Sequence, residues 1–136
     1  MDWMILPYKR YFDFSGRSQR KEYWMFTLLY MLVLIVFVVL MVASAVATAK
    51  NQAPGAGFWI GLGGLLLFFL TSFIPSIAVT VRRFHDQDLS GWMYLLGFIP
   101  SIGGIVIIVF MCIEGTKGVN RFGLDPKGQG DADVFA

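Results

Sequence analysis

The sequence is poor in charge, in cysteine and in histidine. Its 136 residues include one Cys, one His and 20 charged residues, and 15% is a low charged fraction beside the ~25% of soluble domains. A single Cys cannot form an internal bridge, which excludes a disulfide-stapled miniprotein. Disordered chains combine low hydrophobicity with high net charge. The 57% of hydrophobic residues and the net charge of +2 therefore exclude disorder for the chain as a whole.

The charges that are present are confined to short stretches. Residues 23–49, 51–81 and 89–113 contain no Asp, Glu, Lys or Arg, and these runs are 27, 31 and 25 residues long. All 20 charged residues fall in the other 53 positions. A charge at membrane depth is costly, so a bilayer imposes this segregation on a chain. The pattern predicts an integral membrane protein and excludes a soluble domain.

Three hydrophobic segments are expected, at about 23–49, 58–81 and 89–113. A spanning helix needs ~20 mostly apolar residues, whereas strands of a membrane barrel alternate apolar and polar residues. These segments do not alternate, and turn-forming residues at 51–55 join the first two. The sequence therefore predicts an all-α membrane bundle whose first two helices cross the bilayer as a hairpin. We expect one membrane domain over 1–127 and a flexible tail over 128–136.

The third segment has two interpretations. Its middle contains Pro100, Ser101, Gly103 and Gly104, which are helix-breaking residues. The flanking halves have 11 and 13 residues, a length typical of re-entrant or interfacial segments. A single kinked span and a re-entrant hairpin both fit.

Basic residues predict the orientation. Five of the eleven Lys and Arg residues precede the first hydrophobic segment, and Lys50 alone lies between the first two. Short cytoplasmic loops carry an excess of Lys and Arg. We expect a cytoplasmic N-terminus, while the side that holds the C-terminus depends on the path of the third segment.

Three polar blocks flank the hydrophobic segments, at residues 11–24, 82–92 and 114–126. If all three face the cytoplasm, they would form one polar cap over the helices. The candidate cap or lipid-contact residues in these blocks are Arg17, Arg20, Glu22, Trp24, Arg82, Arg83, His85, Asp86, Ser90, Trp92, Asn120, Arg121 and Asp125.

These blocks resemble a known family. Residues 14–24 fit F-x-G-R-x-x-R-x-E-[YF]-W, residues 82–92 fit R-R-[LF]-H-D…S-G-W, and residues 115–126 fit G-x-x-G-x-N-R-[FY]-G-x-D-P. Together they are similar to the small bacterial inner-membrane proteins catalogued as domain of unknown function 805, over roughly residues 8–127. Phe84 and Leu124 are mild departures from that pattern. The resemblance implies a bacterial inner-membrane protein and no established activity.

The basic residues of the first block allow two roles. Arg17, Arg20 and Lys21 have i, i+3, i+4 spacing and precede Trp24, as expected of an anchor to anionic headgroups. Alternatively, one arginine forms a fixed ion pair with Asp86, Asp88 or Glu22.

His85 and Asp86 invite a catalytic or metal interpretation, because a carboxylate often orients an imidazole. Adjacent helical residues do not face each other, however, and a metal site would need more than one His. Arg82 and Arg83 would also repel a cation. We expect no catalytic residue, no metal and no cofactor, and therefore no enzyme. The chain lacks a P-loop pattern, and we expect no nucleic-acid partner.

Small residues predict the packing of the helical hairpin. Gly57 and Gly61 open the second segment, and Ala43 and Ala47 close the first. Small residues four apart let helices approach closely in lipid. We expect tight packing beside the connecting loop, with a homodimer face as the alternative use.

The sequence favours a non-enzymatic module that interacts with the phospholipid bilayer, with a second copy or with another membrane protein. An oligomeric small channel or transporter is the first alternative, although the spans lack the ionisable residues that such proteins use. A membrane enzyme acting on lipid headgroups is the second alternative.

Overall fold

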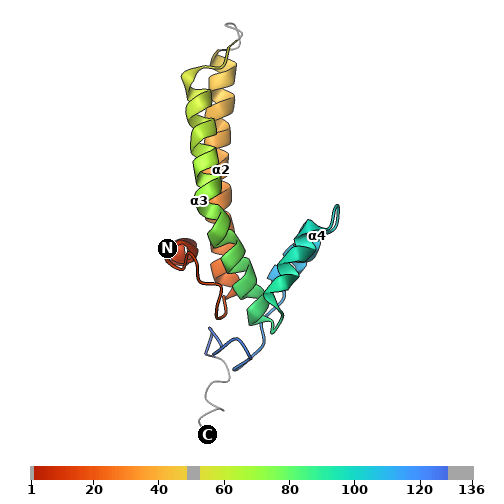
Figure 1. Cartoon of the computed structure of the whole chain (residues 1–136). Coiled ribbons are helices and arrows are strands. Elements are labelled where there is room, and N and C mark those ends of the chain that lie inside the picture. The colour runs from red at the N-terminus through yellow and green to blue at the C-terminus, as the bar shows by residue number, and fades with distance from the viewer. Residues whose placement is uncertain (1, 49–52, 129–136) are drawn as a thin grey trace.

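The chain folds into a long helical hairpin, a short helical hairpin and a polar layer that joins their bases. The structure is a computed structural model that describes residues 2–48 and 53–128. Its elements are α1 (Asp2–Lys9), α2 (Arg20–Ala47), α3 (Ala56–Asp86), the 3₁₀ helix η2 (Gly91–Phe98) and α4 (Gly103–Cys112). Figure 1 shows α2 and α3 side by side, with η2 and α4 as a separate arm that diverges from their base. The expected all-helical fold is confirmed, since the described ranges contain no strand.

Both helices of the long hairpin are long enough to cross a membrane. At 1.5 Å per residue, the 28 residues of α2 and the 31 of α3 extend about 42 and 46 Å, more than the ~30 Å of a hydrocarbon core. Both expected helices are therefore present and are long and apolar enough to span a membrane. The second helix ends later than the expected residue 81, because α3 continues to Asp86. Its last turn therefore belongs to the second polar block.

Figure 1 also shows that α3 changes direction in its second half, where it carries the buried Pro75. Proline removes one backbone hydrogen bond and bends a helix. The hydroxyl groups of Ser72 and Tyr8 form a hydrogen bond of 2.5 Å, which fastens α1 to this region of α3.

The third hydrophobic segment turns back on itself. η2 and α4 have 8 and 10 residues and extend about 16 and 15 Å, which is half of a hydrocarbon core. The turn between them holds Ser101 at φ 69°. A Cβ atom on Gly103 would lie 2.5 Å from the carbonyl oxygen of Leu96, so this glycine permits the close contact of η2 and α4. The segment is therefore a short hairpin of two helices and not one continuous helix, a shape that agrees with the re-entrant interpretation.

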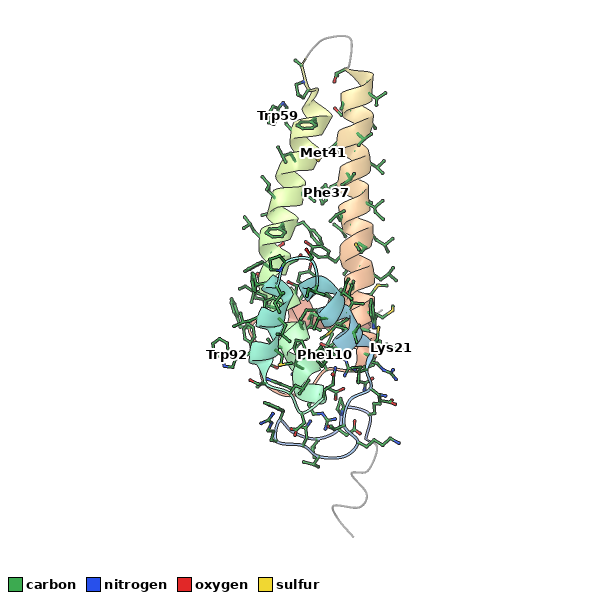
Figure 2. All side chains as sticks on the ribbon, turned by 90° about the vertical axis from the view of Figure 1, so that its right-hand side faces the viewer. Lys21, Phe37, Met41, Trp59, Trp92 and Phe110 are labelled. Carbon is green, nitrogen blue, oxygen red and sulfur yellow. The ribbon has the colours of Figure 1, made fainter. Side chains whose placement is uncertain are left out.

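The packing of α2 on α3 corrects part of the sequence interpretation. Gly57 faces Ser44 and Gly61 faces Met41, where added Cβ atoms would lie 3.0 and 2.6 Å from side-chain atoms. Figure 2 shows Met41 in this interface. Ala43 and Ala47 are exposed instead. With 3.6 residues per turn, Ala43 lies about 200° around the helix from Met41, so it faces away from α3.

Buried side chains gather at the base of the molecule. The largest fully buried residues include Arg82, Arg83 and Phe84 at the end of α3. Along the rest of the hairpin, large apolar side chains such as Val39 and Leu70 are exposed, at 59% and 67%. This distribution is the one expected when lipid surrounds the hairpin and a polar layer closes its base.

Candidate functional site

Most of the three polar blocks, together with a few adjoining residues, meets at the base and forms one layer, which we call the polar cap (residues 10–22, 82–90 and 112–127). Two backbone hydrogen bonds connect the outer blocks to the last turn of α3. The amide of Ser18 donates to the carbonyl of Arg82 at 3.1 Å, and the amide of Thr116 donates to the carbonyl of Asp86 at 2.8 Å. The extension of α3 beyond residue 81 thus supplies the centre of the cap.

Arg17 links all three blocks. Its side chain is 1% exposed, and its Nε donates to Oδ1 of Asp86 at 2.9 Å. One terminal nitrogen donates to the carbonyl of Gly118 at 2.6 Å and the other to the carbonyl of Thr116. Oδ1 of Asp125 lies 4.0 Å from a terminal nitrogen of Arg17, and Oδ2 of Asp125 accepts from the amide of Gly118 at 3.2 Å. The fixed ion pair, rather than the headgroup anchor, is therefore the role of Arg17.

Arg82 joins α3 to the first block. Its side chain is fully buried and donates to Oε1 of Glu22 at 2.9 Å and to Oγ of Ser18 at 3.0 Å. It also donates to the carbonyls of Arg10 and Asp13. Five donors in a planar fork let one guanidinium satisfy this many acceptors.

Arg83 shares the carboxylate of Asp86 with Arg17. Its two terminal nitrogens donate to Oδ2 of Asp86 and to the carbonyl of Ile113. A Cβ atom on Gly115 would lie 2.0 Å from Oδ2, so only glycine lets the third block reach this carboxylate. Asp86, which is 4% exposed, is thus enclosed by two arginines and a glycine. Removing one partner of a buried pair would leave an uncompensated charge.

Weaker ion pairs lie around this centre. Glu114 accepts from Arg20 at 3.2 Å and from Lys127 at 2.6 Å, and Arg121 pairs with Asp88 at 3.1 Å. These side chains are 29–60% exposed, and exposed pairs contribute little to stability. The hydrogen bond from Lys127 holds the pKa of Glu114 below its ordinary value.

The loop before α2 is closed by Asp13. Its carboxylate accepts from the hydroxyl of Ser15 at 2.5 Å and from Nε of Arg10 at 2.8 Å. The hydrogen bond from Ser15, followed by those from Arg10 and the Ser15 amide, lowers the pKa of Asp13 to about 2 against the opposing effect of burial. The loop carboxylate is therefore charged at neutral pH.

The contacts that position His85 come from residues other than Asp86. Its Nδ1 lies 3.2 Å from the carbonyl of Gly16, and its ring stacks on Phe122 with 3.9 Å between centroids. Asn120 donates to the His85 carbonyl at 2.9 Å and accepts from the amide of Phe122, also at 2.9 Å. Because Asp86 faces the arginines, the two neighbours do not form an acid–base pair. Within the described ranges, no cluster of three or more His, Cys, Asp or Glu side chains could hold a metal.

A hollow of about 470 Å³ opens between α3, η2 and the polar cap. Its walls are mostly apolar, and His85 and Ser90 are among its polar lining residues. The lining includes Ile77, Val81, His85, Trp92, Leu95 and Phe122. Small-molecule sites are commonly apolar hollows of this volume with a few polar groups. Sequence reasoning missed the hollow because its walls come from segments that are distant along the chain.

The two tryptophans among the candidate residues lie beside the cap and not at its centre. Trp92 is 78% exposed beside the hollow, and Ser90, the N-cap residue of η2, accepts from its amide at 3.4 Å. Trp24 is 39% exposed on α2 and contacts Tyr23 edge to face. Figure 2 shows Trp92 and Lys21 at the level of the cap, far from Trp59 near the other end. Their position suits the interfacial aromatic belt of a membrane protein.

The family match covers most of the cap. The family model described as "Protein of unknown function (DUF805)" matches residues 11–124. The chain belongs to this family. Inner membrane protein YhaI of Escherichia coli K12 is 41% identical over 127 residues, which are 93% of this chain and 97% of the relative. Inner membrane protein YhaH of the same strain is 44% identical over 127 residues, 93% and 98% of the two chains.

No solved structure matches the chain. The DUF805 relatives carry names that state a membrane location. Together with two apolar helices of spanning length, the family identifies this chain as a membrane protein.

Proposed function

We propose that this DUF805 chain is a non-enzymatic module of the bacterial inner membrane that binds phospholipid in the hollow beside η2. In this proposal α2 and α3 cross the bilayer, and the η2–α4 arm sits in the cytoplasmic leaflet. The observation that carries it is the hollow itself. Its apolar walls include Val81 of α3 and Leu95 of η2, and its polar lining residues His85 and Ser90 belong to the cap.

The state of the cap side chains supports a role without catalysis. The guanidinium groups of Arg17, Arg82 and Arg83 donate hydrogen bonds to acceptors inside the chain. A general acid–base pair needs an imidazole within reach of its carboxylate, and Asp86 is engaged by the two arginines. The charged side chains of the polar cap thus hold the three blocks together.

The distribution of basic residues supports a cytoplasmic cap. Ten of the eleven Lys and Arg residues belong to α1, to the cap or to the cap ends of α2 and α3, and the eleventh, Lys50, lies in the sequence between α2 and α3. A re-entrant third segment returns the C-terminal block to the N-terminal side, which adds its basic residues to the same face. By the positive-inside rule, this face is cytoplasmic.

A channel or transporter receives less support. Such proteins place ionisable residues inside their spans. The helical stretches 23–47 and 56–81 contain no Asp, Glu, Lys or Arg.

Two single-tryptophan variants test lipid binding in the hollow. One keeps Trp92, which lines the hollow, and the matched control keeps Trp59, which is 60% exposed near the far end of α3. The other tryptophans are replaced by Phe, and both proteins are reconstituted with phospholipid brominated on its acyl chains. The bromines quench the fluorescence of both tryptophans in the bilayer.

Transfer to unbrominated detergent separates bound lipid from surrounding lipid. We expect Trp59 to recover its fluorescence and Trp92 to stay quenched, because a lipid held in the hollow leaves slowly. Equal recovery of both tryptophans would refute lipid binding at this site.

A further inference from the structure

The ring of His85 is oriented so that one nitrogen faces the hollow. A carbonyl oxygen can only accept, so the contact from Nδ1 to the Gly16 carbonyl at 3.2 Å places the proton of an uncharged ring on Nδ1. Stacking on Phe122 at an interplanar angle of 4° fixes the plane of the ring. Nε2 is then a hydrogen-bond acceptor with a set direction.

Gly91 leaves the approach to this acceptor open. A Cβ atom at Gly91 would lie 3.3 Å from Nε2 of His85 and 2.7 Å from Cγ1 of Val81. The next residue toward α3, Ser90, also lines the hollow, and its Oγ accepts from the Trp92 amide. The hydroxyl hydrogen of Ser90 remains available for donation. An acceptor and a donor that line the same hollow suit a hydroxyl group, which both donates and accepts.

We infer that His85 and Ser90 form a headgroup site for a phospholipid that ends in hydroxyl groups, as a glycerol headgroup does. This site rests on the proposed function, in which a phospholipid occupies the hollow. The acyl chain lies along Val81 and Leu95, and a headgroup hydroxyl donates to Nε2 of His85.

Native mass spectrometry of the full-length chain in detergent tests the site. The protein is mixed with equimolar phosphatidylglycerol and phosphatidylmethanol of identical acyl chains, which share one negative charge and differ in hydroxyl groups. We expect phosphatidylglycerol to be retained roughly five-fold over phosphatidylmethanol, the effect of one net hydrogen bond. Equal retention by the wild-type protein would overturn the headgroup site, with no variant needed.

His85→Phe keeps an aromatic ring for stacking on Phe122 but removes Nε2. We expect this variant to retain phosphatidylglycerol only as well as phosphatidylmethanol, because the hydrogen bond that separates the two lipids is lost. A preference that survives the substitution would overturn the role of His85. Phosphatidylethanolamine is the third probe, and its retention at the level of phosphatidylglycerol would overturn the assignment to a hydroxyl headgroup.

Val81→Phe separates this inference from the proposed function. The larger side chain fills the hollow, so total lipid retention should fall for every headgroup. Val39→Phe is the control, because Val39 is 59% exposed on α2 away from the hollow. Unchanged retention in Val81→Phe would refute lipid binding in the hollow, whereas a fall without headgroup preference in the wild type would refute only the headgroup site.

Discussion

The two ends of the α2–α3 hairpin are held together by different interactions. At the far end, Gly57, Gly61 and Gly64 of α3 meet side chains of α2 at distances that leave no room for a Cβ atom. At the cap end, Arg82 of α3 reaches Glu22 of α2 through a buried ion pair. The same two helices are thus matched by shape at one end and by charge at the other.

The difference follows from the surroundings of each end. Lipid is as apolar as the helix faces, so close packing rather than the hydrophobic effect selects the helix contacts. At the cap, buried charges must be paired with specific partners because an unpaired charge is costly. The far end therefore tolerates changes that preserve shape, and the cap tolerates changes that preserve pairing.

The largest expected difference between the two ends is their side of the membrane. In a Cys112→Ser background, we expect Ser15→Cys and Lys117→Cys to react with an impermeant maleimide only from the cytoplasmic face. Ala53→Cys, beside the connecting loop, should react only from the opposite face. Intact cells and inverted vesicles give the two readings. Labelling of Lys117→Cys from outside would contradict a re-entrant third segment in the membrane.

The next largest effect is expected at the centre of the cap. Asp86→Ala leaves Arg17 and Arg83 buried without their shared carboxylate, and should lower the free energy of unfolding by about 3–5 kcal/mol. Asp88→Ala is the matched control because it removes an exposed pair with Arg121 and should lose about 0–1 kcal/mol. Unfolding in detergent measures both. Similar losses in the two variants would show that burial of the ion pair is unimportant.

The smallest effect is expected at the far end of the hairpin. Gly64→Ala places a Cβ atom 2.4 Å from the ring of Phe37 and should destabilise the hairpin by about 1–3 kcal/mol. A Cβ atom added to the neighbouring Gly63 would lie more than 4 Å from every atom of the described residues, apart from its chain neighbours and the nearby backbone of α3. Gly63→Ala should therefore be neutral or stabilising, since alanine favours helix. If both variants unfold at the same denaturant concentration, close packing does not hold this end.

Local patterns predicted part of the site and missed another part. The i, i+3 spacing of Arg17 and Arg20 suggested one shared face, but Arg17 is buried on Asp86 while Arg20 pairs with Glu114 at the exposed edge. The importance of Gly115 is visible only in space, where its missing Cβ admits the carboxylate of Asp86. Spacing along the chain describes a helix face and carries no information on what later packs against it.

The sequence by itself determined that the chain enters a membrane, where its two long helices lie, and which residues are polar enough to remain at an edge. These properties follow from local composition, because bilayer thickness and the cost of buried charge act on each segment separately. Only the tertiary structure decided that the third segment turns back, that Arg17 binds Asp86 across 69 positions, and that a hollow opens beside His85. Those outcomes depend on contacts between distant segments, which must satisfy the buried charges together.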